Sequence, residues 1–194
     1  MKYFFDTEFI EDGKTIDLLS IGIVAEDGRT FYQCNRDAKL DKATDWVIWN
    51  VYPTLGVMYN TERWYWKEAE KQDSTMRWDH SAVVVPRSEI RDRLRKFVGG
   101  VIVTDDKPEF WAYYADYDWV VLCQLFGTMM DLPKGWPMYC RDVKQLCDSL
   151  GNPKLPEQTS KEHHALEDAR WTKQAYEFLG TVAAKRWTIN TEAE

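Results

Sequence analysis

Hydrophobic and polar residues alternate at the start of the chain. Over residues 2–10 successive side chains leave opposite faces of an extended segment, which is the period of a β-strand. Two further strands are predicted over residues 15–25 and 30–35, each preceded by a turn that contains an Asp-Gly pair. These segments predict two consecutive hairpins, so this part of the sheet should be antiparallel.

Helical spacing of apolar residues dominates the remaining sequence. Helices are predicted over residues 41–51, 61–70, 88–98, 117–130, 142–150 and about 163–187, and strands over residues 109–113 and 137–140. Strand–helix alternation after a run of hairpins predicts an α/β fold, with a mixed central sheet and helices on both faces.

The chain of 194 residues has the length of one domain. No repeat, low-complexity tract or linker divides it. We therefore predict a single domain over residues 1–187, with a candidate insertion at about residues 56–86 and a flexible polar tail over residues 188–194.

Composition restricts the class of protein. A hydrophobic fraction of 44% is sufficient for a full core, and no apolar run reaches the roughly 18 residues of a membrane helix. The N-terminus turns acidic too early for a secretory signal, and the four cysteines form no closely spaced pair. We expect a cytoplasmic protein without membrane contact. The net charge of -7 argues against a passive nucleic-acid binder, but it is compatible with an enzyme whose carboxylates hold cations.

Two acidic residues interrupt the first predicted strand. Asp6 and Glu8 are two positions apart, so their side chains leave the same face of an otherwise apolar strand. Like charges on a half-buried face repel each other and lose hydration. A compensating cation or a protonated carboxyl group would explain the pair, and an exposed strand end is the alternative.

Two later helices carry acidic residues on their apolar stripes. Asp118 heads the stripe of the helix predicted over residues 117–130, although a helix cap is an equally good explanation there. Asp168 lies on the inward stripe of the last helix, and His163 precedes it in the loop or first turn. The neighbouring His164 should point elsewhere.

Together these residues predict a metal centre. Oxygen-only ligands favour Mg²⁺ or Mn²⁺ over zinc. Two such ions about 3.5–4 Å apart can stabilise the attacking and leaving oxygens of a phosphodiester. A nearby histidine can take the proton from the attacking water, because its pKa is close to working pH.

Three segments resemble the motifs of a known nuclease family. Residues 5–9 (FDTEF), 115–118 (ADYD) and 163–169 (HHALEDA) are similar, in that order, to the three motifs of the DnaQ-like DEDDh 3′–5′ exonucleases. Residues 6–13 (DTEFIEDG) and 19–29 (LSIGIVAEDGR) are similar to the polyadenylate-specific 3′-exoribonucleases of the RNase AS type. The resemblance covers nearly the whole chain.

The resemblance implies an RNase H-like fold and 3′–5′ exoribonuclease activity on single-stranded RNA ends. Such an enzyme releases nucleoside 5′-monophosphates with two Mg²⁺ ions, for which Mn²⁺ can substitute, and a preference for poly(A) and a homodimer are further expectations. It implies metal binding by Asp6, Glu8, Asp118 and Asp168, a general base at His163, and contacts to the terminal nucleotide by Thr7, Phe9, Leu19 and Ser20.

One stretch departs from the family pattern. Residues 56–86 match the RNase AS type poorly, which leaves the choice between RNA and single-stranded DNA open. Within this stretch Trp64, Trp66 and Trp78 could stack on bases, but packing or dimer contact explains them equally well. A catalytically silent nucleic-acid-binding module is a third alternative. It is less favoured because it gives no chemical reason to retain four inward carboxylates.

Overall fold

The computed structural model describes residues 1–55, 58–60, 76–78, 82–99 and 107–191. Its central sheet has six strands in the order β6-β3-β2-β1-β7-β8. β2 is antiparallel to its neighbours β1 and β3, and the other pairs are parallel. The two predicted hairpins and the mixed sheet are therefore confirmed. The strand bounds are β1 Lys2–Glu11, β2 Ile16–Ala25, β3 Thr30–Asn35, β6 Val84–Val85, β7 Glu109–Ala112 and β8 Arg141–Asp142.

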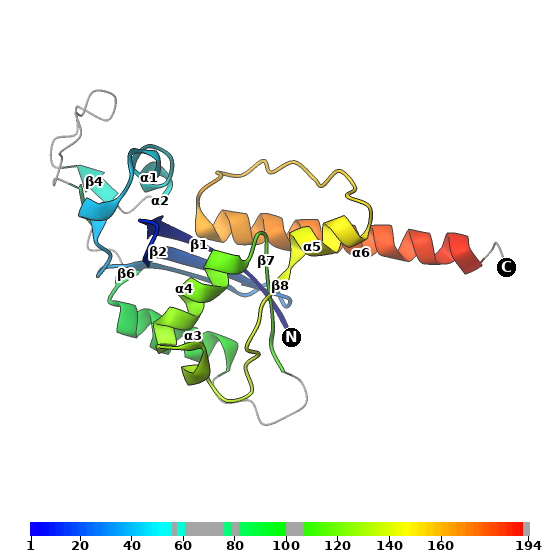
Figure 1. Cartoon of the computed structure of the whole chain (residues 1–194), viewed down its shortest axis with the longest axis horizontal. Coiled ribbons are helices and arrows are strands. Elements are labelled where there is room, and N and C mark those ends of the chain that lie inside the picture. Colours follow the sequence, from blue (N-terminus) through cyan, green and yellow to red (C-terminus); the bar gives the residue numbers. More distant parts are fainter. Residues whose placement is uncertain (56–57, 61–75, 79–81, 100–106, 192–194) are drawn as a thin grey trace.

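Helices cover both faces of the sheet, as predicted. α6 packs across β1 and β2 on one face, whereas α3 and α4 lie on the other (Figure 1). A separate antiparallel pair joins β4 (Met58–Asn60) to β5 (Met76–Trp78). No helix in the described ranges is both long and apolar enough to cross a membrane. The helical bounds are η1 Leu40–Lys42, α1 Asp45–Asn50, α2 Tyr52–Leu55, α3 Arg87–Val98, α4 Asp116–Phe126, η2 Met129–Asp131, α5 Val143–Ser149 and α6 Ala165–Thr191.

Several predicted boundaries are wrong for local reasons. The single helix predicted over residues 41–51 is interrupted at Thr44, which is extended and accepts a hydrogen bond from the Val47 amide as the N-cap of α1. Pro53 does not stop the next helix, because it lies in the first turn of α2, where a missing amide costs little. The helix predicted over residues 117–130 ends at Phe126, before Gly127 at φ 123°.

Two other predictions need correction near the C-terminus. The last sheet strand lies at β8, directly after the predicted range 137–140. α6 begins two residues later than predicted and continues to Thr191, into the predicted flexible tail. Residues 192–194 of that tail, and the helix predicted over residues 61–70, lie outside the described residues.

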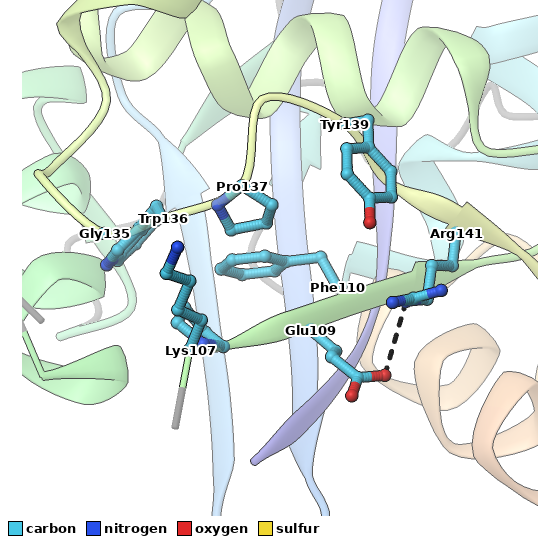
Figure 2. A pocket seen from close by; sticks show the side chains of 9 residues that line it. Lys107, Glu109, Phe110, Gly135, Trp136, Pro137, Tyr139 and Arg141 are labelled. Atoms are coloured by element: carbon cyan, nitrogen blue, oxygen red, sulfur yellow. Dashed lines mark ion pairs between the residues drawn. The ribbon is translucent and has the colours of Figure 1, made fainter. Parts of the chain in front are cut away.

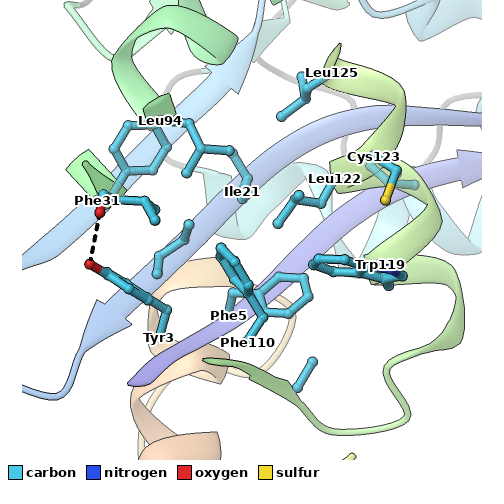
Figure 3. Close-up of a cluster of buried hydrophobic side chains, with 14 of the residues drawn as sticks. Tyr3, Phe5, Ile21, Phe31, Leu94, Phe110, Trp119, Leu122, Cys123 and Leu125 are labelled. Atoms are coloured by element: carbon cyan, nitrogen blue, oxygen red, sulfur yellow. Dashed lines mark hydrogen bonds between the residues drawn. The ribbon is translucent and has the colours of Figure 1, made fainter. Parts of the chain in front are cut away.

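The main core fixes which way β1 faces (Figure 3). Tyr3 and Phe5 point toward α3 and α4, where both rings contact Phe110 at centroid distances of 5.6 and 6.1 Å. The Tyr3 hydroxyl also donates a hydrogen bond of 3.2 Å to the Val98 carbonyl. Because side chains alternate along a strand, this packing directs Asp6 and Glu8 to the opposite face, toward α6.

Gly22 allows α6 to lie directly on the sheet. A Cβ atom at this position of β2 would collide with the backbone of Ala165 and Leu166 in the first turn of α6. The missing side chain therefore sets how closely the start of α6 approaches β1 and β2. This turn carries the residues between His163 and Asp168.

The Gly22→Ala substitution is expected to destabilise the protein, because the helix must move or the added methyl group must overlap its backbone. Overpacking of this kind costs about 1–3 kcal/mol, and in a chain of this size each kcal/mol lowers Tm by about 2–4 °C. Thermal unfolding followed by circular dichroism measures the effect. Gly180→Ala is the control, since the space around Gly180 in α6 is open and alanine should be neutral or stabilising there.

Candidate metal centre

Three acidic side chains from two elements converge beneath the start of α6. Asp6 and Glu8 come from β1 and Asp168 from the first turns of α6, and each offers an oxygen within 4.8 Å of the others. Glu8 is 8% exposed, and Asp6 and Asp168 are partly buried. A cluster of carboxylate oxygens at this spacing fits a hard divalent cation such as Mg²⁺ or Mn²⁺.

Asp118 connects α4 to the same strand. Its buried carboxylate accepts two hydrogen bonds from Thr7, one from the backbone amide at 2.8 Å and one from the hydroxyl at 2.6 Å. Thr7 lies between Asp6 and Glu8, so these bonds fix the start of α4 beside the three converging carboxylates. Asp118 does not itself belong to the group whose oxygens lie within 4.8 Å of one another.

The two strand carboxylates have raised pKa values. Burial raises the pKa of Asp6 well above its usual range, and the charges of Asp118, Glu8 and Asp168 raise it further. For Glu8 burial is again the main cause of a raised pKa, followed by the charges of Asp168 and Asp118. The like charges of the cluster thus disfavour ionisation of both carboxyl groups, and a bound cation would relieve that repulsion.

The two helix carboxylates are partly compensated by their neighbours. Burial raises the pKa of Asp118 to about 6, although the hydrogen bonds from Thr7 oppose the shift. Burial also raises the pKa of Asp168, and the Gln158 amide and His163 oppose that shift. Each helix residue is therefore held by a hydrogen-bond donor even without a metal ion.

These raised pKa values predict the pH dependence of metal-free stability. The folded chain binds the cluster's protons more tightly than the unfolded chain, whose carboxyl groups have ordinary pKa values. The stabilising contribution is thus complete below about pH 4 and is lost as pH rises through the folded values, about 6 for Asp118. Removing one carboxylate charge from the cluster should diminish this loss of stability at neutral pH.

In EDTA the Asp6→Asn variant should therefore unfold at a higher temperature than the wild type at pH 7. The difference should shrink toward pH 4, where the wild-type carboxyl groups are protonated. Calorimetry at several pH values measures it, and a relief of about 1 kcal/mol corresponds to about 2–4 °C. A variant less stable than the wild type at pH 7 would contradict the repulsion between these carboxylates.

His163 occupies a tight turn directly before α6. Its backbone is left-handed at φ 63°, and the Trp46 ring of α1 meets its imidazole edge-on at a centroid distance of 5.0 Å. The neighbouring His164 has different surroundings, because its ring stacks on Tyr32 at 4.5 Å. The two adjacent histidines therefore contact separate parts of the molecule.

The four residues predicted to contact a nucleotide have unequal access to solvent. Phe9 is partly exposed and packs edge-on against Tyr117 at 5.8 Å, whereas Thr7 is buried against Asp118. Leu19 and Ser20 are fully buried, and Leu19 belongs to a core cluster with Ile10, Val47, Val51, Tyr52 and Leu55. In this structure Leu19 and Ser20 support the sheet beneath the site and offer no surface to a ligand.

Three supporting residues escaped the sequence analysis. The Gln158 amide, from the loop before α6, donates a hydrogen bond to the Asp168 carboxylate. The Asp142 carboxylate caps α5 and accepts a 3.0 Å bond from the Ala115 amide at the start of α4. The Thr54 hydroxyl of α2 donates to the His163 carbonyl. Of these three, Asp142 had a local signal, because aspartate at the start of the helix predicted over residues 142–150 is a favoured N-cap residue.

A separate cavity of about 560 Å³ lies near the N-terminal end of β7 (Figure 2). Phe110 and Pro137 lie next to each other in its lining, and Arg141 forms a 3.3 Å ion pair with Glu109 at its side. In the parallel register Glu109 lies opposite Lys2, four positions before Asp6 along β1. None of the residues lining this cavity belongs to the predicted site, so the carboxylate cluster and the cavity are distinct features.

The sequence is similar to that of known 3′–5′ exoribonucleases. The family model of the 3′–5′ exoribonuclease Rv2179c-like domain matches residues 1–179. The chain is 38% identical over 170 residues to the 3′–5′ exoribonuclease Rv2179c of Mycobacterium tuberculosis strain H37Rv, a match that covers 88% of each chain. The 3′–5′ exoribonuclease MT2234.1 of Mycobacterium tuberculosis strain CDC 1551 matches with the same identity and coverage. All five predicted metal-binding and base residues lie within the matched range.

Proposed function

The chain belongs to the Rv2179c-like 3′–5′ exoribonuclease domain family, and we propose that it is a metal-dependent exonuclease that shortens RNA from the 3′ end. The convergence of Asp6, Glu8 and Asp168 is the observation that carries the metal dependence. Buried like charges are costly in a metal-free protein, whereas a cation makes the same arrangement favourable.

The residues divide into metal ligands and a general base. Asp6, Glu8, Asp118 and Asp168 would hold two Mg²⁺ ions, with Mn²⁺ as a substitute. When bound, the ions would supply Lewis-acid stabilisation of charge at the scissile phosphate. His163 would take the proton of the water that attacks the scissile phosphate. The bond from phosphorus to the 3′ oxygen of the preceding nucleotide would then break, which releases a nucleoside 5′-monophosphate, and that oxygen would take a proton from solvent to become the new 3′-hydroxyl. The place of His163 in the turn before α6, five positions from Asp168, supports its role as the base.

The finer assignments are inferred from the resemblance to DEDDh exonucleases of the RNase AS type. Thr7 and Phe9 would contact the terminal nucleotide, since both lie on β1 beside the carboxylates. A preference for poly(A) and a homodimeric state belong to the same proposal. Trp64 and Trp66 lie outside the described residues, as does the side chain of Trp78, so their predicted stacking on bases stays a prediction.

Digestion of end-labelled homopolymers tests the proposed function. Adenylate, uridylate and cytidylate RNA, and matching DNA strands, would be labelled at either end and incubated with Mg²⁺, Mn²⁺ or EDTA. With 3′-labelled RNA the label should appear at once in a mononucleotide. With 5′-labelled RNA the full-length band should shorten gradually, and EDTA should stop both reactions.

Each arm of this experiment tests one element of the proposal. Undiminished cleavage in EDTA would contradict metal dependence, and early release of a 5′ label would contradict the polarity. Faster digestion of DNA than of RNA would contradict RNA as the preferred substrate and identify single-stranded DNA in its place. Equal rates on all RNA homopolymers would remove the preference for poly(A) and leave the activity itself intact.

A further inference from the structure

The turn that carries His163 is held by a helix from a distant part of the sequence. The Thr54 hydroxyl of α2 donates a hydrogen bond to the His163 carbonyl across 109 positions. The Trp46 ring of α1 also contacts the His163 imidazole. α1 and α2 are anchored in turn by Val47, Val51 and Leu55, which are buried in a core cluster with Ile10 of β1.

A count of donors and acceptors favours the His163 carbonyl as the acceptor of the Thr54 proton. A threonine hydroxyl has one proton to donate, and its oxygen lies near two carbonyls, those of Val51 and His163. The Val51 carbonyl already accepts the backbone amide of Thr54 at 3.0 Å. Among the described residues, the His163 carbonyl has the Thr54 hydroxyl as its hydrogen-bond donor. The His163 turn therefore depends on this hydroxyl more than the Val51 carbonyl does, because the Val51 carbonyl has a second donor in the Thr54 amide.

The backbone conformation of His163 depends on its surroundings, which include this hydrogen bond. A left-handed conformation at φ 63° is uncommon for a residue with a side chain and persists only where its surroundings hold it. The same turn sets the direction of the imidazole and leads into Asp168 one helical turn later. A loosened turn would thus move the base before it moved the strand carboxylates.

We infer that Thr54 is a positioning residue for His163 and that the α1–α2 pair serves to orient the general base. The inference rests on the proposed function, because it assigns Thr54 a role only through the chemistry of His163. Thr54 itself touches neither the carboxylate cluster nor a reacting atom. Trp46 restricts the imidazole from the side, and Thr54 fixes the backbone from which the imidazole extends.

Kinetics of the full-length Thr54→Val variant test this inference. The substitution retains the shape of threonine and removes the hydroxyl. We expect kcat on 3′-labelled RNA to fall about ten- to hundredfold, the size of effect that misplacement of a catalytic group produces. KM and the Mn²⁺ concentration for half-maximal activity should be unchanged. Thr54→Ser restores the donor and should recover most of kcat.

Thr181→Val is the matched control. The Thr181 hydroxyl donates at 2.7 Å to the carbonyl three positions earlier in α6, and it is remote from the His163 turn. The Thr54 oxygen likewise lies 2.8 Å from the carbonyl three positions earlier in the chain, so the two sites differ in the added contact to His163. This control should turn over RNA like the wild type. Circular dichroism at the assay temperature verifies that all three variants are folded, so that a loss of kcat reports on the site.

A double variant separates positioning from general destabilisation. If Thr54 acts through His163, Thr54→Val should add no further loss in a His163→Ala background. Equal losses in both backgrounds, or a full rate for Thr54→Val, would overturn the inference and leave the proposed function standing. A wild-type protein without exonuclease activity would instead overturn the proposed function.

Discussion

The Asp168→Asn variant is expected to lose RNA hydrolysis by at least about a thousandfold while remaining folded. Asparagine retains the size of aspartate and an oxygen that can accept the Gln158 hydrogen bond, so the first turns of α6 should stay in place. It removes the negative charge that Asp168 contributes to the converging carboxylates. Several kcal/mol of transition-state stabilisation depend on ions held there, and each 1.36 kcal/mol changes the rate tenfold.

Single-turnover digestion of labelled RNA measures this loss, and Mn²⁺ titration measures the accompanying loss of metal affinity. Asp116→Asn provides the control, since Asp116 carries the same charge near the site but is exposed in the first turn of α4. Both variants change the net charge equally. Full turnover by Asp168→Asn, or equal losses in the two variants, would contradict the metal centre.

The hairpins of the sheet could be predicted from the sequence because their signals are local, whereas β6 was not predicted and β8 was placed too early. The alternation over β1 and the Asp-Gly turns on either side of β2 specify the hairpins without reference to the rest of the chain. The errors fall where one residue interrupts a periodic pattern, as Thr44 does before α1 and Gly127 does after α4. Apolar spacing continues through both positions, so periodicity alone could not place the breaks.

The four carboxylates could be identified from the sequence because they lie on strand and helix faces whose other residues are apolar. Asp6, Glu8, Asp118 and Asp168 each violate the hydrophobic pattern of the element that carries them, which is a signal within a single strand or helix. Residues that hold a functional group through a long-range hydrogen bond give no such signal. Thr54 fits its own helix as well as any polar residue, and only the folded chain brings it to His163.

Replacement of His163 by alanine is the second large effect that we expect. A general base contributes about 10²–10⁴-fold to a rate, so kcat for RNA should fall by a factor in this range. Metal binding should be mostly retained, because the carboxylate oxygens that converge belong to Asp6, Glu8 and Asp168. His163→Ala should therefore differ from Asp168→Asn in its Mn²⁺ titration, although both slow hydrolysis.

His164→Ala distinguishes a base from a structural imidazole. The His164 ring stacks on Tyr32, and burial lowers its pKa, which favours the neutral imidazole. Its removal should lower Tm and leave most of kcat intact, whereas His163→Ala should lower kcat more than Tm. An equal loss of kcat from His164→Ala would show that the assignment of the general base to His163 is wrong. The two adjacent histidines have separate surroundings, which makes this comparison decisive. His163 contacts α1 and α2, whereas the ring of His164 stacks on Tyr32 of β3.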